Sequence, residues 1–191
     1  MGLLDFLSAK DRGGRQRAAG ALYGAAVAQA RQPAFYTALG APDTLEGRFE
    51  LIALHVHLLC RRLGKSGADG TALAQALFDT MFRDMDRNLR ELGVGDPSLP
   101  RRVKAMIQAY YGRIKAYDAA LAAGGGALEK AIARNVHNAD AVTPGAEALA
   151  GYVRRTAELL EAAPAEALLA GRVAFAPLAP AATSGETAPP R

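Results

Sequence analysis

The 191-residue sequence contains one cysteine, three histidines and no tryptophan. A single cysteine, Cys60, excludes an internal disulfide and most metal sites built from cysteine. It lies in the run Leu-Leu-Cys-Arg, which is more typical of a small buried hydrophobic residue than of a nucleophile. His55 and His57 are two positions apart, so on a helix they diverge by about 200° and cannot share a metal ion as an i,i+4 pair can. We therefore expect no metal centre and no cofactor.

Signatures of catalysis are also missing from the sequence. There is no glycine-rich phosphate loop and no dinucleotide-binding fingerprint. Asp84 and Asp86 are two positions apart in a predicted helix and point in different directions, so they do not form a paired-carboxylate site. The sequence predicts a protein that is not an enzyme.

Long apolar runs are absent, and none reaches the roughly 18 residues needed to cross a bilayer. The first seven residues carry an apolar patch but no charged stretch or cleavage site of a signal peptide. Phe6 also occupies the position where a myristoylation motif has serine or threonine. We expect a cytoplasmic protein, and Leu3, Leu4, Phe6 and Leu7 leave open a peripheral contact with the inner face of the cytoplasmic membrane.

No segment alternates with the period of two that marks a strand, whereas apolar residues recur at helical spacing. The sequence therefore predicts an all-α fold, a single helical-bundle domain of about six to eight helices over residues 17–175. Residues 1–16 are expected to be a flexible N-terminal lead. Residues 176–191 are rich in proline, alanine, serine and threonine, and we expect a disordered C-terminal tail. The predicted helices cover approximately residues 17–31, 34–39, 45–63, 71–92, 98–123, 128–136, 144–161 and 164–170.

The helix predicted from Leu45 to Leu63 has two apolar stripes on nearly opposite sides. One stripe includes Val56 and Leu59, and the other includes Leu54 and Leu58. A helix that is apolar on two faces packs between neighbours, so we expect this one to be the central helix. Asp43 or Thr44 is expected to cap its N-terminus.

Two further helices carry charged outer faces. On the helix over residues 71–92, Asp79 with Arg83 and Asp86 with Arg90 form i,i+4 pairs, each worth a few tenths of a kcal/mol. The next helix has a basic outer face that could meet phosphates of RNA or of lipid headgroups. No aromatic residue is expected on that face, which weakens the case for single-strand binding, and no specific DNA binding is expected. The basic residues are Arg101, Arg102, Lys104, Arg113 and Lys115. Gly112, within this helix, predicts a close neighbour because glycine costs about 1 kcal/mol relative to alanine there.

Four blocks of sequence, in a fixed order, carry a resemblance to a known family. They are Ala30-Arg-Gln-Pro-Ala-Phe-Tyr36, Asp43-Thr-Leu-Glu-Gly-Arg-Phe-Glu50 followed by Leu54-His55, the stretch from Phe82 to Asp96, and Arg102-Val-Lys104 through Tyr111-Gly-Arg113 to Tyr117. In this order the blocks resemble the ubiquinol–cytochrome c chaperone family, whose members are assembly factors for the cytochrome bc1 complex. Pro97, where a hydrophobic residue is commoner in the family, is a small departure.

The resemblance implies a non-enzymatic chaperone for the ubiquinol–cytochrome c reductase (cytochrome bc1) complex. Its implied partner is cytochrome b during maturation, or a bc1 assembly intermediate. The mitochondrial relatives act with a small partner protein and associate with the ribosome, so a small co-chaperone and a ribosome contact are further expectations. The resemblance brings no catalytic residues.

We predict that the partner-binding surface consists of charged and polar residues of these blocks that a helical wheel places outside the core. They are Asp43, Arg48, His55, Asp84, Asp86, Arg90, Glu91, Asp96 and Arg113. Helix caps and local ion pairs explain several of them equally well. Two other functions remain open, a ribosome- or RNA-tethering module that uses the basic helix 101–115, and a helical protein that binds haem or quinone, with His55 as the candidate ligand.

Overall fold

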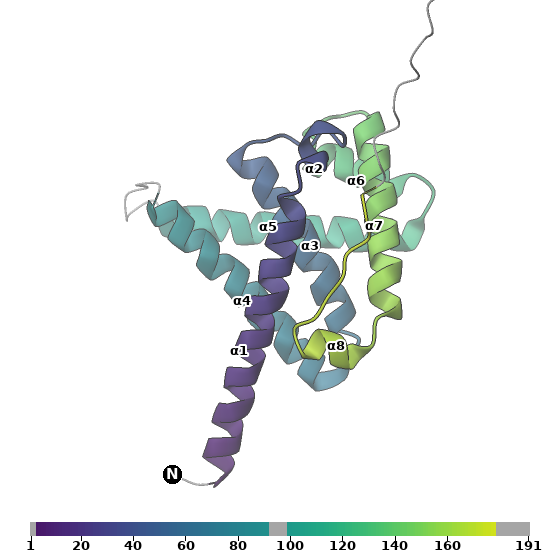
Figure 1. Cartoon of the computed structure of the whole chain (residues 1–191). Coiled ribbons are helices and arrows are strands. Elements are labelled where there is room, and N and C mark those ends of the chain that lie inside the picture. The colour runs from purple at the N-terminus through teal and green to yellow at the C-terminus, as the bar shows by residue number, and fades with distance from the viewer. Residues whose placement is uncertain (1–2, 92–98, 179–191) are drawn as a thin grey trace, which may run out of the picture.

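The computed structural model of the chain describes residues 3–91 and 99–178. Within these ranges every regular element is a helix, which confirms the all-α prediction (Figure 1). The helices are α1 (Leu3–Ala30), α2 (Ala34–Thr37), α3 (Leu45–Leu63), α4 (Gly67–Glu91), α5 (Leu99–Ala123), α6 (Ala127–Asn135), α7 (Pro144–Ala162) and α8 (Ala165–Leu169).

Helix α3 lies at the centre of the fold, as its two apolar stripes predict. The hydroxyl of Thr44 accepts a hydrogen bond from the Gly47 amide at 3.1 Å and so caps the helix. Leu54 and Leu58 of one stripe and Val56 and Leu59 of the other are all buried. Helices α1, α4, α7 and α8 pack around α3, so apolar surface on both of its sides is removed from water.

Helix α1 crosses the front of the molecule and packs against α3 and α4 (Figure 1). Its buried positions are mostly small, including Ala18, Ala19 and Ala26, and this lets the helices approach closely. On α4, Leu77 and Met81 are fully buried on the apolar half that the sequence predicts.

Three consecutive glycines, Gly124, Gly125 and Gly126, connect α5 to α6. All three have positive φ, at 67°, 54° and 83°, a conformation that glycine adopts without a steric penalty. The expectation of a close neighbour at Gly112 is wrong, since no described atom beyond its own turn of helix lies within 4 Å of the position that its Cβ would occupy.

The two ends of the predicted domain also need correction. Helix α1 begins at Leu3 and not near Arg17, so residues 3–16, predicted as a flexible lead, are helical although they lack apolar periodicity. Residues 176–178, predicted as the start of the tail, lie against the core, because Ala176 is buried and Leu178 packs against it. The rest of the predicted tail, residues 179–191, lies outside the described residues. Among the helices described, none is long and apolar enough to span a membrane.

Candidate partner-binding surface

Four of the nine predicted surface residues lie exposed in the structure, namely Asp43, Arg48, Arg90 and Glu91, and Asp86 is partly exposed. Arg48 Nε donates to Asp43 Oδ1 at 2.6 Å where α3 begins, and this hydrogen bond lowers the pKa of Asp43. Arg90 Nε donates to Asp86 Oδ2 at 2.9 Å on α4, as the i,i+4 spacing predicts. None of these side chains is among the buried residues of the core. Asp96 lies outside the described residues.

Asp84 is partly buried and connects two helices. Its Oδ2 accepts a hydrogen bond of 2.8 Å from the Tyr23 hydroxyl of α1, and Arg87 forms an ion pair with its Oδ1. Burial and the neighbouring Asp84 carboxylate raise the pKa of Tyr23 well above its usual range, so the hydroxyl remains a donor. Asp84 therefore links α4 to α1, and this structural role explains why an aspartate lies at this position.

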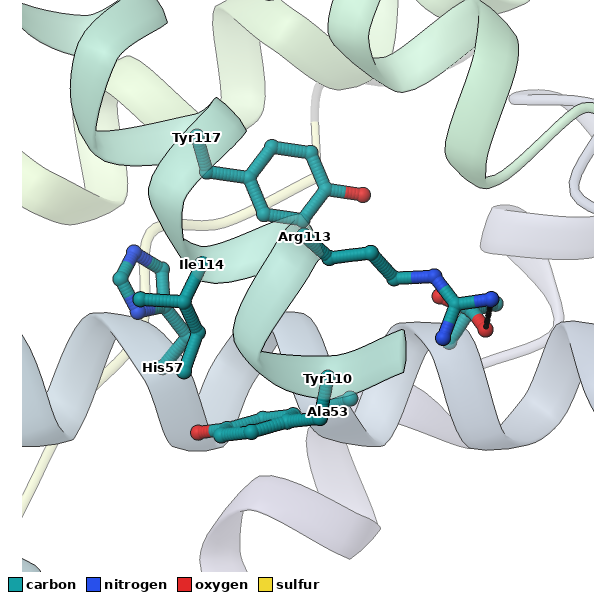
Figure 2. Close-up of a pocket in the computed structure, with 7 residues that line it drawn as sticks. Ala53, His57, Tyr110, Arg113, Ile114 and Tyr117 are labelled. Carbon is teal, nitrogen blue, oxygen red and sulfur yellow. Dashed lines mark ion pairs between the residues drawn. The ribbon is translucent and has the colours of Figure 1, made fainter. Parts of the chain in front are cut away.

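Arg113 is likewise partly buried, and its side chain lies against α3. Its Nη2 lies 2.8 Å from Oε1 of Glu50, which is only 7% exposed. Burial raises the pKa of Glu50 to about 7 although the nearby Arg113 charge acts to lower it. This pair is the main polar link between α3 and α5 at this position (Figure 2).

The Glu50–Arg113 pair belongs to a group of polar side chains between the two helices, which we name the polar seam. It comprises Glu50, His57 and Arg61 of α3 and Tyr110, Arg113, Tyr117 and Asp118 of α5. Asp118 Oδ1 lies 3.2 Å from both His57 Nε2 and Arg61 Nε. Burial lowers the pKa of His57 more than Asp118 raises it, so its ring is neutral near pH 7.

Several buried atoms of the polar seam lack a hydrogen-bond partner among the described residues. They include Glu50 Oε2 and the hydroxyls of Tyr110 and Tyr117, and the His57–Asp118 contact is not aligned as a hydrogen bond. The cleft that they line has a volume of about 10 Å³, enough for about one water molecule.

The prediction that His55 lies on the surface is wrong, because its side chain is completely buried. Nδ1 lies 2.7 Å from the Leu51 carbonyl oxygen, and Nε2 lies 2.7 Å from the Tyr152 hydroxyl. The carbonyl can only accept, so Nδ1 carries the proton and Nε2 accepts from Tyr152. The Tyr152 oxygen in turn accepts from Gln29 of α1 at 3.1 Å. His55 therefore connects α3 to α7 and α1.

These contacts weigh against the haem and quinone alternative. Both ring nitrogens of His55 are already hydrogen-bonded, and burial lowers the pKa of the ring to about 4. Within the described residues, no group of three or more histidine, cysteine or carboxylate side chains is placed to hold a metal ion. Cys60 donates weakly to the Ala74 carbonyl at 3.6 Å, and burial raises the pKa of its thiol to about 12. Cys60 is therefore protonated and unreactive at neutral pH.

The basic face of α5 differs from the prediction in two ways. Arg113 turns toward Glu50, whereas Arg101, Lys104 and Lys115 remain exposed. Tyr111 is 56% exposed and stands seven residues after Lys104 and four before Lys115, on the same side of the helix. An aromatic residue is therefore interleaved with the basic residues, contrary to expectation. The side chain of Arg102 is outside the described part.

The predicted set misses Tyr23, Glu50, Tyr152 and Asp118, which make the polar contacts between helices. Glu50 and His57 fall on one polar strip of the central helix. This strip was the sequence feature that could have identified them as contacts between helices. A polar strip on a helix with two apolar faces has little access to solvent, so its members need partners on another helix. Tyr152 and Asp118 gave no such signal, because their partners come from distant helices.

Comparison with known proteins supports one family throughout. The family model described as "Ubiquinol-cytochrome C chaperone" matches residues 37–175. The chain is 27% identical to ubiquinol-cytochrome-c reductase complex assembly factor 1 of Xenopus laevis over 146 residues, which is 75% of this chain and 73% of that protein. The Mus musculus protein of the same name is also 27% identical, over 75% of this chain but only 50% of its own length. This chain thus spans about half of the mammalian relative.

A solved structure agrees with the sequence comparisons over nearly the whole chain. The crystal structure of the Cbp3 homolog from Brucella abortus has a TM-score of 0.81 and 35% sequence identity, and the similarity covers 92% of this chain and 98% of that one. With the family match over residues 37–175 and this agreement in fold, the chain belongs to the ubiquinol–cytochrome c chaperone family.

Proposed function

We propose that this protein is a non-enzymatic chaperone that binds cytochrome b during its maturation and assembly into the cytochrome bc1 complex. The observation that carries the proposal is the family match over residues 37–175, together with the relatives named as assembly factors for this complex. The proposal also includes a location in the cytoplasm or at the inner face of the cytoplasmic membrane, where a membrane-protein client can be met.

The described surface is compatible with a binding role. The ion pairs Asp43–Arg48 and Asp86–Arg90 lie in the second and third of the matched blocks and contribute little to the core. Exposed charged pairs of this kind stabilise a fold weakly but can determine which partner is accepted. These pairs therefore support the proposal that this surface binds a partner.

Deletion of the gene in a respiring strain tests the proposal directly. We expect the assembled bc1 complex and cytochrome b to fall together while other respiratory complexes persist, and we expect plasmid-borne protein to restore both. Photo-crosslinking from position 43 or 86 during synthesis of cytochrome b should then recover cytochrome b. Normal bc1 levels in the deletion strain would refute the assembly role, and bc1 loss without a cytochrome b crosslink would point to a different client.

A ribosome contact is a second candidate that the exposed face of α5 favours. Arg101, Lys104 and Lys115 are exposed on the same helix as Tyr111, which provides an aromatic surface on which a base can stack. We expect cosedimentation with ribosomes to weaken steeply as salt rises. The double variant Lys104→Ala with Lys115→Ala should reduce cosedimentation at every salt concentration, and no effect of this variant would exclude the face as a tether. A contact with a small co-chaperone also remains a proposal.

A further inference from the structure

After α8 the chain turns back and runs in an extended form between α1 and α7, in front of α3 (Figure 1). We name residues 171–178 the strap. Gly171 makes the turn with a φ of +78°, and a Cβ at this position would lie 3.0 Å from the Ala18 Cα of α1. The strap therefore starts in tight contact with α1 and then lies between α1 and α7 (Figure 1), and we call the surface beneath it, around His55, the groove.

Side chains rather than backbone hydrogen bonds hold the strap in this groove. The amides of Gly171 and Arg172 donate to the carbonyls of Leu168 and Ala167, each at 2.9 Å. From residue 173 to 178 the backbone makes no hydrogen bond to any residue that the structure describes. Ala176 is buried, whereas Val173, Phe175 and Leu178 are only partly buried. Release of residues 173–178 therefore breaks apolar contacts but no backbone hydrogen bond to a described residue.

The floor of the groove is a cluster of aromatic rings from separate elements. Phe175 meets the ring of His55 edge to face, with centroids 5.1 Å apart and planes at 87°. Phe35 of α2 and Tyr152 of α7 contact the same histidine ring at 5.4 and 5.6 Å. Because the hydrogen bonds of His55 run to Leu51 and Tyr152, they do not involve the strap. The floor can remain intact when Phe175 leaves.

We propose that this groove is a binding site for an extended apolar segment of a client protein, and that the strap occupies it in the absence of the client. The strap itself shows which chemistry the groove accepts: an extended chain with a phenylalanine over His55 and small or aliphatic residues on either side. An incoming segment of this kind replaces the apolar contacts that the strap gives up. Only the identity of the client, a membrane protein rich in such segments, rests on the proposed function.

The test uses the full-length chain and a fluorescent peptide with the sequence of residues 172–178. In the wild-type protein the strap competes with the peptide, so we expect weak binding by fluorescence anisotropy. The variant Phe175→Ala weakens the strap, and it should bind the peptide at least tenfold more tightly. A peptide carrying Phe175→Ala should lose this gain. The matched control is Phe78→Ala, which truncates another partly buried phenylalanine, on α4, and should bind as weakly as the wild type.

Equal binding by the wild-type protein and Phe175→Ala, or an equal gain in Phe78→Ala, would overturn the proposal. A second measurement applies even if Phe175→Ala fails to fold. In a Cys60→Ser background, the thiol of Ala176→Cys should react with a maleimide in the native protein far faster than that of Leu58→Cys, which lies in the core. Equal protection of both thiols would show that the strap is a permanent part of the core. That result would leave the dependence of bc1 assembly on the protein unaffected.

Discussion

Burial holds the ring of His55 neutral, although the hydrogen bond to the Leu51 carbonyl acts to raise its pKa. Its pKa is lowered to about 4 in the folded state, against 6.5 in the unfolded chain. The unfolded state therefore binds more protons between these values, and stability falls as pH is lowered from about 6.5 toward 4. The slope from this one group is at most about 1.4 kcal/mol per pH unit.

We predict that His55 does not titrate above pH 5 and carries its proton on Nδ1. Nitrogen-15 chemical shifts of the ring, followed from pH 8 to 5, measure both properties. The variant His55→Phe keeps a ring but leaves the Tyr152 hydroxyl without its acceptor, which should cost about 1–3 kcal/mol at pH 7. His137, on the outer side of the fold and only partly buried, provides a second ring for comparison. Titration of His55 near pH 6.5 would contradict the buried network.

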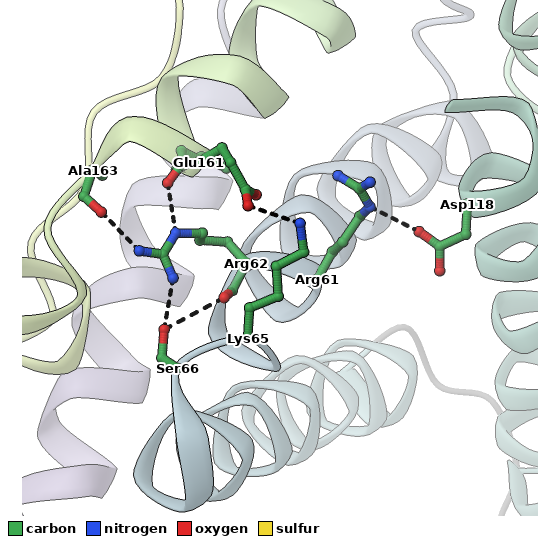
Figure 3. A network of polar contacts seen from close by, with 8 residues as sticks. Arg61, Arg62, Lys65, Ser66, Asp118, Glu161 and Ala163 are labelled. Carbon is green, nitrogen blue, oxygen red and sulfur yellow. Dashed lines mark hydrogen bonds and ion pairs between the residues drawn. The ribbon is translucent and has the colours of Figure 1, made fainter. Parts of the chain in front are cut away.

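Arg62 of α3 has a different role, because its guanidinium caps the C-terminal end of α7. Its Nε donates to the Leu160 carbonyl at 2.9 Å, and its Nη2 donates to the Ala163 carbonyl at 2.8 Å (Figure 3). A third bond of 2.7 Å reaches the Ser66 hydroxyl. Carbonyls at a helix C-terminus lack partners within the helix, and a cation there also interacts favourably with the helix dipole.

We predict that Arg62→Lys lowers the free energy of unfolding by about 2–4 kcal/mol, since an ammonium cannot reproduce the fork geometry and charged hydrogen bonds are worth about 1.5–3 kcal/mol each. Chemical denaturation measures the loss. The control is Lys65→Met, which removes an exposed pair with Glu161 beside the same helix end and should have a much smaller effect. Equal losses in the two variants would argue against the capping role.

At the scale of elements, the polar seam distinguishes the α3–α5 contact from the apolar contacts of α3 with α1 and α4. The raised pKa of the Glu50 carboxyl changes stability with pH in the direction opposite to that of His55. Glu50 binds a proton more tightly in the folded state, with a pKa of about 7 against 4.5 when unfolded, so its contribution to stability falls as pH rises from 4.5 to 7. Below pH 6.5 the two residues therefore have opposing effects on the pH dependence of stability.

We predict that Glu50→Gln gains stability relative to the wild type as pH rises from 4.5 to 7, by up to about 3 kcal/mol over this range. The amide keeps the shape of the side chain but has no charge to desolvate. Urea denaturation at several pH values measures the difference between the two proteins. Glu129→Gln is the matched control, because Glu129 pairs with Arg154 at 2.7 Å but its pKa is lowered. A pH-independent difference for Glu50→Gln would show that Glu50 stays ionised.

The sequence predicts well those elements whose helices carry an apolar stripe. The bounds of α3 and α7, the Thr44 cap and the central place of α3 follow from the spacing of apolar residues and from cap chemistry. The first half of α1 has no stripe, so periodicity could not detect it. Residues 176–178 of the strap were placed in the tail because their composition resembles a disordered segment, and the contact of Phe175 with His55 of α3 depends on tertiary packing alone.

The helical wheel predicts the exposure of some residues correctly and of others wrongly, for a related reason. A helical wheel identifies the side that faces away from one apolar stripe, and this suffices for Asp86 and Arg90 on α4. It fails for His55, because α3 is covered on more than one side and the covering residues, Tyr152 and Phe175, come from the other end of the chain. Surface residues of a central helix cannot be inferred from that helix alone.

At the scale of the whole molecule, the proposed function requires a surface that a partner recognises. The residues of that surface should contribute little to the stability of the fold. The pair Asp86–Arg90 meets this requirement on α4, with side chains 37% and 56% exposed. Exchange of the two charges, Asp86→Arg with Arg90→Asp, keeps the net charge and the i,i+4 spacing. An exposed helix pair is worth about 0.3–0.5 kcal/mol, so we expect little change in melting temperature.

A partner that recognises the two charges would meet each one in the place of the other, and like charges brought together at an interface oppose binding. We therefore predict that the exchanged protein folds and accumulates normally but fails to restore the assembled bc1 complex in the deletion strain, as measured by native gel and haem spectra. The matched control exchanges another exposed pair outside the predicted surface, Lys65→Glu with Glu161→Lys, and should restore assembly. Full restoration by both exchanged proteins would remove Asp86 and Arg90 from the binding surface. Failure of both would indicate a general effect of charge exchange on the protein, and only the contrast between the two supports recognition at α4.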